Sequence, residues 1–185
     1  NAEKADRNKP MNIESDALRY DDLKQLSIFT GKVVVTKGTI VIRGAKVEVR
    51  QDPEGYQFGT VTAEPGARAF YRQKREGLDE FIEGEGEVIY YDGRADTVRF
   101  STRAEMRRYK GAQLFDESSG SVIVYDNTTD VFTVDSGALP GTPGIGGRVR
   151  TMLTPTSKAE GTAARPTASA SAPALKPSNA LGDKK

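Results

Sequence analysis

Short runs of alternating apolar and polar residues extend from Met11 to about Val149, and this alternation constrains the fold more than any other feature. The runs are rich in Val, Ile, Phe, Tyr and Thr and are bounded by Gly, Asp, Asn or Pro, which is typical of half-buried β-strands. No convincing apolar stripe follows helical spacing over about ten residues. Residues 12–20 are ambiguous, and residues 102–111 favour a strand or a bulge. The clearest predicted strands are residues 28–36, 39–43, 46–50, 88–91, 97–101, 121–125 and 130–135.

A weak internal repeat organises these strands into hairpin-like units. Each of four units has an apolar alternating strand that ends in an acidic turn, marked by Asp21, Asp52, Asp92 and Asp126. Asp92-Gly93 is a good tight-turn signal. The spacing suits stacked hairpins that each add one layer to an elongated roll.

Composition excludes several function classes. The 27 Lys and Arg nearly balance the 26 Asp and Glu, whereas nucleic-acid binding usually shows a basic excess. The chain has no Cys and no His, so it lacks disulfides, thiolate sites and the usual neutral-pH acid–base and metal-binding side chain. We therefore expect no cofactor and no metal. No apolar run is long enough for a transmembrane helix.

The two ends differ from the body of the chain. Residues 155–185 are dominated by Ala, Pro, Ser, Thr and Lys, a composition that cannot offset its ordering entropy by burial, so we expect a disordered tail. Residues 1–9 are expected to be flexible, which leaves residues 10–154 as the domain. The first residue is Asn rather than Met, which hints at a processed product.

Charged residues fix the phase of most strands, because alternate side chains face opposite sides. Val47 and Val49, for example, oppose Lys46, Glu48 and Arg50. A packed core is the ordinary outcome of such alternation. A roll that leaves its end strands unpaired, and so available for strand addition, remains the alternative.

One string of motifs resembles a known family. Ile13-Glu14-Ser15-Asp16 is followed by Phe29-Thr30-Gly31 with Val33, and then by Gly38-Thr39-Ile40. Together these resemble the OstA-like family of periplasmic lipopolysaccharide-transport bridge proteins. Further agreement lies at residues 45–47, 67–71, 83–84, 120–125 and 148–155, so the resemblance covers roughly residues 10–155. The long tail and the insertion-like residues 140–147 depart from the family pattern.

The resemblance implies an open, twisted β-jelly-roll of about sixteen short antiparallel strands. It implies a periplasmic, non-enzymatic carrier that binds the acyl chains of lipid A in an apolar groove. Met11 and Ile13 would lie at the N-terminal edge of the groove, and Phe70 and Tyr91 would line its middle. With the strand phases, the predicted lipid-binding set is Met11, Ile13, Leu18, Tyr20, Phe29, Val33, Val35, Ile40, Ile42, Val47, Val49, Phe70, Ile89, Tyr91, Val98, Phe100, Ile123, Tyr125, Phe132 and Val134.

Partners also follow from the resemblance. One terminal edge would pair with an LptC-like inner-membrane component, the other with an LptD-like outer-membrane component, and copies would associate end to end. The alternatives are an N-terminal-type domain of the outer-membrane assembly protein, a polysaccharide-active β-roll enzyme, and a pure stacking scaffold with a filled core.

Two charged clusters are weaker candidates for binding sites. Basic residues at 72–75 and 103–110 could meet head-group phosphates, although a solvated face is the favoured interpretation. Glu80, Glu83, Glu85 and Glu87 could hold a divalent cation, although exposed charge that protects a strand is favoured.

Overall fold

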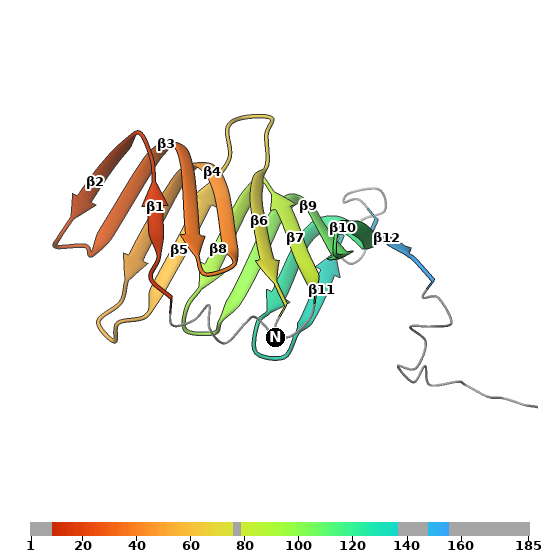
Figure 1. Ribbon diagram of the computed structural model, residues 1–185. Coiled ribbons are helices and arrows are strands. Elements are labelled where there is room, and N and C mark those ends of the chain that lie inside the picture. The colour runs from red at the N-terminus through yellow and green to blue at the C-terminus, as the bar shows by residue number, and fades with distance from the viewer. Residues whose placement is uncertain (1–8, 76–78, 137–147, 156–185) are drawn as a thin grey trace, which may run out of the picture. The chain divides into compact units, whose positions relative to one another are not determined.

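The computed structural model describes residues 9–75, 79–136 and 148–155, and twelve antiparallel strands occupy most of them (Figure 1). No helix occurs in these ranges, and none that could span a membrane is found there. In chain order the strands are β1 (Asn12–Glu14), β2 (Ala17–Asp21), β3 (Leu26–Lys37), β4 (Ile40–Gln51), β5 (Gln57–Thr62), β6 (Ala69–Lys74), β7 (Glu80–Gly86), β8 (Val88–Asp92), β9 (Thr97–Lys110), β10 (Gln113–Asp126), β11 (Val131–Asp135) and β12 (Arg150–Leu153).

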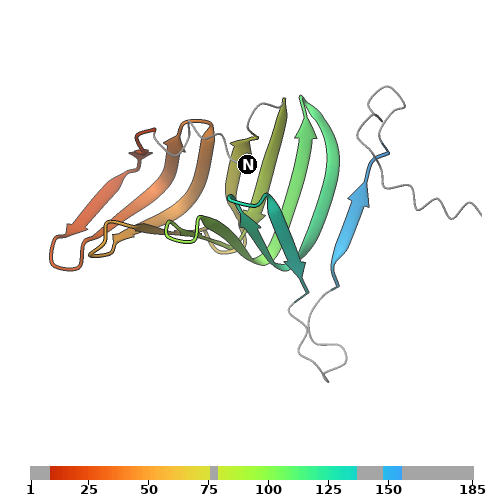
Figure 2. The ribbon, with the colours of Figure 1, turned by 90° about the horizontal axis from the view of Figure 1, so that it is seen from below.

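Four long strands join two layers into one hydrogen-bonded sheet. Layer A contains β2, β5, β8 and β11, and layer B contains β1, β6, β7 and β12. The long strands β3, β4, β9 and β10 each give one half to each layer. Figure 1 shows β1, β6 and β7 in front of β5 and β8, and Figure 2 separates the layers from below.

The sharing of long strands between the layers explains why the strand count is lower than the expected value of about sixteen. The structure has twelve strands, and counting the four shared strands once for each layer gives sixteen segments. The predicted strands 39–43 and 46–50 are the two halves of β4. Residues 102–110 form the second half of β9, which follows a bulge, in line with the strand or bulge expected there, and most of residues 12–20 lie in β1 and β2.

The long strands turn from one layer to the other at matched irregularities. In β3, Gly31 and Lys32 have positive φ of 84° and 44°, and the register with β4 shifts there. In β9, Thr102 and Arg103 have φ of 65° and 51°, and the register with β10 shifts at the same point. In both cases two residues on one strand oppose one residue on its partner, so each bulge adds one extra residue and bends its strand.

The four Asp markers of the repeat perform the same structural task. Each carboxylate accepts backbone N–H groups from its own turn: Asp21 from Lys24, Asp52 from Glu54 and Tyr56, Asp92 from Arg94 and Ala95, and Asp126 from Thr128 and Thr129. Asp is suited to this position because its short side chain can hydrogen-bond the following backbone.

Successive turns are also bonded to one another through the backbone. Asp96 accepts from the Asn127 N–H at 3.0 Å, and Gln57 accepts from the Gly93 N–H at 2.9 Å. The turn that begins at Asp92-Gly93 is wider than the predicted two-residue tight turn, because four residues separate β8 from β9.

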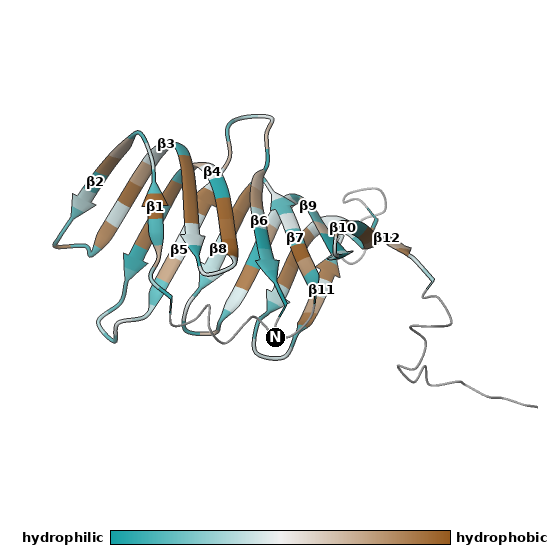
Figure 3. Ribbon diagram, in the orientation of Figure 1, coloured by the Kyte–Doolittle hydropathy of each residue, from teal (hydrophilic) through white to brown (hydrophobic). Residues whose placement is uncertain are grey.

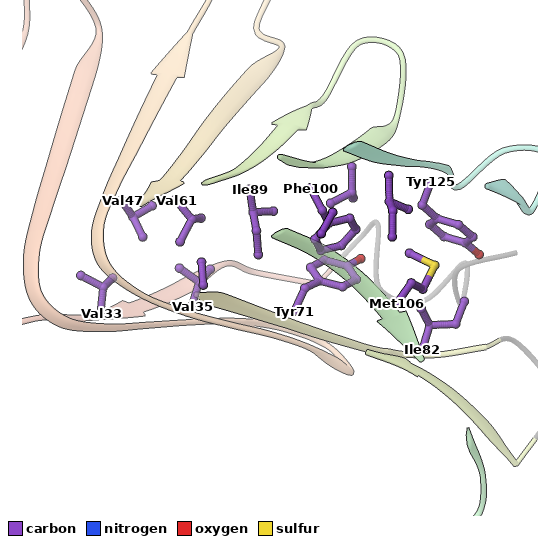
Figure 4. Packing of buried hydrophobic residues seen from close by; sticks show 14 residues of the cluster. Val33, Val35, Val47, Val61, Tyr71, Ile82, Ile89, Phe100, Met106 and Tyr125 are labelled. Atoms are coloured by element: carbon purple, nitrogen blue, oxygen red, sulfur yellow. The ribbon is translucent and has the colours of Figure 1, made fainter. Parts of the chain in front are cut away.

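The core lies between the facing layers (Figure 4). One cross-strand row of layer A runs Phe29, Val47, Val61, Ile89, Phe100, Ile123 and Val134. Layer B presents Val33, Val35, Tyr71, Ile82 and Met106 toward it. Apolar residues recur at alternate positions along the strands, which puts them on this inner side (Figure 3).

Gly84 sets how closely the layers approach near the middle. A Cβ at this position of β7 would lie 2.4 Å from the Phe100 ring of β9. Phe100 is fully buried, and its ring meets that of Tyr71 edge to face at 5.7 Å between centroids. The ring therefore occupies the space that a side chain at Gly84 would need.

We expect Gly84→Ala to lower the free energy of unfolding by about 1–3 kcal/mol, because an added methyl group overpacks the core. Gly59→Ala is the matched control, since its nearest atoms would lie 3.9 Å away at ordinary contact distance. Urea denaturation of both variants and the wild type measures the difference. Equal stability of the two variants would contradict the packing described for Phe100.

Candidate lipid-binding cavity

A cavity of about 450 Å³, partly open to solvent, lies between layer B and the turns of layer A. Its apolar wall comes from Val35 of β3, Ile40 and Ile42 of β4, and Tyr71 of β6. Tyr91 of β8 also lines it, and the remaining lining residues are Met11, Lys37, Gly55, Tyr56, Gln57, Gln73, Gly93, Arg94, Ala95, Asp96, Asn127 and Thr128. The arrangement can take up an aliphatic chain, because apolar side chains line one wall and the cavity is not sealed.

Five residues of the predicted lipid-binding set line this cavity: Met11, Val35, Ile40, Ile42 and Tyr91. Ile13, Phe29, Val49, Phe132 and Val134 are partly buried against the core instead. The inward positions expected for these ten residues, from strand phase or from the family resemblance, therefore agree with the structure, and their role in binding lipid stays a prediction.

Seven further residues of the set are packed in the core. Val33, Val47, Ile89, Val98, Phe100, Ile123 and Tyr125 are at most 4% exposed. Ile89, Ile123 and Tyr125 belong to strands that are apolar on both faces, and alignment with the repeat predicts them to be inward, which their burial confirms. The ordinary packed core is therefore present along the middle of the domain, and a lipid chain would reach these side chains only if the layers separated.

Three residues of the set lie elsewhere. Phe70 was expected in the middle of the groove, but it lies on the outer face, where the Arg43 guanidinium sits 5.3 Å from its ring centroid. The prediction is wrong because β6 buries Ala69, Tyr71 and Gln73, which turns Phe70 outward. Leu18 and Tyr20 are 59% and 57% exposed, because β2 is an edge strand.

The predicted lipid-binding set missed the turn residues that line the cavity and the buried polar side chains of its wall, here called the polar wall, Gln73 and Asn127. Tyr56, Arg94 and Asn127 follow the Asp markers of three turns, so the repeat carried a signal for them. The periodicity alone did not identify Gln73, because a polar residue on an inward position breaks the alternation. Gln73 and Asn127 are 2% and 4% exposed.

Several arginines and carboxylates of the basic and acidic clusters pair with each other on the outer face of layer B. Arg107 contacts Glu83, Glu85 and Glu105 at 3.5, 3.2 and 2.9 Å. Arg68 contacts Glu85 at 2.8 Å and Glu105 at 2.9 Å. Arg107 of β9 is directly opposite Glu83 and diagonal to Glu85 of β7, Glu105 lies two residues before it on β9, and Arg68 immediately precedes β6, so the charges form a network across neighbouring strands.

This network changes the pKa of two carboxyl groups. Burial alone would raise the pKa of Glu105, but hydrogen bonds from Glu117, Arg68 and Arg107 outweigh it and lower the pKa to about 2. Glu117 shows the opposite effect: its hydrogen bond to Glu105 raises its pKa, with burial adding to the shift. The acidic stretch is thus engaged by arginines, and within the ranges that the structure describes no group of three or more Asp or Glu is arranged to hold a metal ion.

Comparison with known proteins identifies the family. The sequence profile of the "LptA/(LptD N-terminal domain) LPS transport protein" family matches residues 12–131. The chain belongs to this family.

Individual relatives agree with this assignment. The lipopolysaccharide export system protein LptA of Haemophilus influenzae is 33% identical over 124 residues, which cover 66% of this chain and 68% of the relative. The export system protein LptH of Pseudomonas aeruginosa is 27% identical over 161 residues, which cover 84% and 85%.

A solved structure confirms the fold. The crystal structure of LptH, described as the LptA-homologous periplasmic component of the lipopolysaccharide transport device of P. aeruginosa, superposes with a TM-score of 0.68. The match covers 82% of this chain and 99% of that structure at 24% identity. The predicted jelly-roll class is therefore confirmed. Three expectations lie outside the described residues, apart from residues 9 and 155: flexibility of residues 1–9, an insertion at residues 140–147 and disorder of residues 155–185.

We expect Glu105→Gln to reduce stability near pH 7 and to lose this effect in acid. The pKa of Glu105 is lowered in the folded state, so its carboxylate stabilises the fold fully above about pH 4.5, and this contribution is lost as pH falls toward 2. The measurement is the free energy of unfolding against pH for both proteins. Glu64→Gln is the control, because Glu64 is exposed outside the network. A stability difference that stays constant from pH 7 to pH 2 would contradict the role assigned to Glu105.

Proposed function

We propose that this protein is a periplasmic lipopolysaccharide carrier that holds acyl chains between its two layers and links inner- and outer-membrane transport components. The partly open cavity with its apolar wall is the observation that carries the proposal. Belonging to a family of lipopolysaccharide-transport proteins supports the choice of ligand. No enzymatic step is part of this role, and the named relatives are export-system proteins rather than polysaccharide-active enzymes.

The cavity suits partial rather than complete burial of a chain. Each buried CH₂ contributes about 0.8 kcal/mol, so complete burial of a long chain would make release slow. A cavity open on one side desolvates part of a chain and leaves the rest accessible. Tyr91 and Tyr56 are suited to its rim, because each has an apolar ring and a hydroxyl that can stay hydrated.

The ends of the sheet support the proposal of end-to-end assembly. In the part of the chain that the structure describes, β1 and β2 pair only with β3, and β11 and β12 pair only with β10. Each end therefore has one short strand per layer with an unpaired edge, and another strand can pair with such an edge. Exposed Leu18 and Tyr20 at one end, and Val131 and Leu153 at the other, would be covered by such pairing.

The partners follow from these two ends. An LptC-like inner-membrane component would pair with one edge, an LptD-like outer-membrane component with the other, and copies of this chain would pair with each other. The family description also includes the N-terminal domain of the outer-membrane protein. The relatives that match are named as LptA and LptH, which favours a separate carrier.

A photoreactive side chain at Ile42 or Tyr91 should crosslink to lipopolysaccharide, because both positions line the cavity. The same group at Arg99 is the matched control, since Arg99 lies on a central strand but is exposed on the outer face. Crosslink yield per irradiated protein is the measurement. Equal crosslink yields at all three positions would contradict the proposal that the ligand enters between the layers.

Edge pairing predicts a specific crosslink between two different single variants. The chain has no Cys, so Arg19→Cys on β2 and Thr133→Cys on β11 each introduce one thiol, and both residues are exposed on edge strands. A short bifunctional thiol reagent should join the two variants when they are mixed, because β2 of one copy lies beside β11 of the next. Gel analysis of mixtures in which one variant is tagged separates mixed from like pairs.

Arg99→Cys in place of either variant is the control for random collision. Its mixed dimer should stay at the background level. Equal yields from the edge variants and from this control would contradict end-to-end assembly while leaving the cavity proposal intact.

A further inference from the structure

An ion pair bridges the two layers at the point where the cavity ends. In layer B the cavity is lined by β3, β4 and β6, and Gln73 is the last residue of β6 that lines it. In layer A the last lining residue is Thr128, in the turn after β10. Arg75 and Asp130 each follow one of these residues by two positions, and the Arg75 Nη2 lies 3.8 Å from the Asp130 Oδ2. The pair therefore joins the layers at this end of the cavity.

Both members of the pair are held in position by their own layer. The Arg75 Nη1 donates to the Glu80 Oε2 at 2.9 Å, and the Arg75 backbone N–H donates to the Glu80 carbonyl oxygen at 2.9 Å. The Tyr125 hydroxyl donates to the Asp130 Oδ1 at 2.5 Å, and Tyr125 is only 2% exposed. The bridge is thus anchored on β7 in layer B and on the core of layer A.

A second contact between the layers lies on the next strands. Arg108 of β9 is directly opposite the buried Ile82 of β7, so it faces inward, and its Nη1 lies 3.5 Å from the Asp116 Oδ2 of β10. Its guanidinium carbon lies 5.9 Å from the ring centroid of Phe132, which belongs to β11 of layer A. Charged side chains therefore take part in the contact between the layers beyond the cavity, whereas apolar side chains make it around Phe100.

We propose that the Arg75–Asp130 bridge is a clasp that opens to let a lipid chain pass from the cavity into the interior beside Tyr125. On the side where β3 and β9 cross from one layer to the other, continuous strands hold the layers together. On the opposite side the turns of layer A face the hairpins of layer B, and no strand pairing joins them in the described residues. Side chains there can separate while the sheet stays paired. This inference rests on the proposed function, because the passage of lipid is what the opening would serve.

A charged contact suits an opening because its members regain hydration when they part. Separating apolar surfaces such as that of Phe100 exposes them to water without compensation, whereas a partly exposed ion pair contributes little net stability. The side chains of Arg75 and Asp130 are 20% and 24% exposed. The Arg75 Nε is buried and has no acceptor among the described residues, so opening would also hydrate this group.

The first measurement is the distance between two spin labels on the open side of the full chain. The chain has no Cys, so Ala112→Cys in the β9–β10 hairpin and Thr129→Cys in the turn after β10 place one exposed label on each layer. Pulsed electron paramagnetic resonance gives the distribution of distances. Asp130→Asn removes the charge but keeps an acceptor for the Tyr125 hydroxyl. It should enlarge the long-distance fraction about fivefold, the factor expected for the loss of one partly exposed ion pair.

Glu87→Gln is the matched control, because it breaks a 2.9 Å ion pair with Arg103 at the bulge where β9 passes from one layer to the other. It should keep the wild-type distribution of distances. Arg75→Gln should act like Asp130→Asn, and if one variant fails to fold, the other still tests the clasp. In the wild type, added lipopolysaccharide should enlarge the same long-distance fraction, and this arm needs no substitution in the clasp.

The second measurement is crosslinking of lipopolysaccharide to a photoreactive group at Met106. This side chain is 4% exposed and lies beyond Tyr71 in the core (Figure 4). Asp130→Asn should raise the crosslink yield at Met106 about fivefold, in step with the larger open fraction. The yield at Ile42 should not change, because Ile42 already lines the cavity.

Unchanged distances in both Asp130→Asn and Arg75→Gln would overturn the inference, and so would an unchanged yield at Met106 or an equal response of Glu87→Gln. Crosslinking at Ile42 without these changes would leave the carrier function standing. If lipopolysaccharide crosslinks at neither Ile42 nor Met106, the proposed function fails and the passage of lipid fails with it. The distances measured without lipid would still decide whether the ion pair holds the layers together.

Discussion

The continuity of four hydrogen-bonded strands through both layers is the constraint on which the rest of the structure depends. Because β3, β4, β9 and β10 each serve two layers, the backbone is paired from one end of the domain to the other without a separate second sheet. The bend must then be made inside a strand, where a change of direction normally breaks pairing. The paired left-handed residues of β3 and β9 make it at the cost of one shifted register each.

That continuity also explains why the interior is uneven. Where the layers are tied closely, small residues allow direct contact, as Gly84 does beneath the Phe100 ring. Beyond this contact, layer B faces the turns of layer A and the ends of β5 and β8. The cavity lies there, with a strand wall on one side and turn residues such as Tyr56 and Arg94 on the other. A filled core and an accessible cavity can therefore coexist between the same two layers.

The sequence predicts the strands that alternate clearly, and it predicts their phase. Val47, Val98 and Phe100 are inward because charged or polar neighbours fix the opposite face, and this information is local. Layer B is harder to predict because its outer face contains cross-strand charge pairs and an outward Phe70, so apolar character no longer marks the inside. The strands β5, β6, β7 and β12 were absent from the clearest predicted strands for related reasons: short length, glycines or mixed faces.

The candidate site was only partly predictable because it combines residues from two kinds of pattern. Its apolar wall follows strand periodicity, which local sequence shows. Its polar wall does not: Gln73 occupies an inward position where periodicity expects an apolar residue, and Asn127 follows an Asp whose evident role is the turn. Burying such groups is unfavourable unless something pairs with them, so their presence is informative once burial is known. In this fold the departures from alternation, rather than the alternation itself, distinguish the wall of the cavity from the packed core.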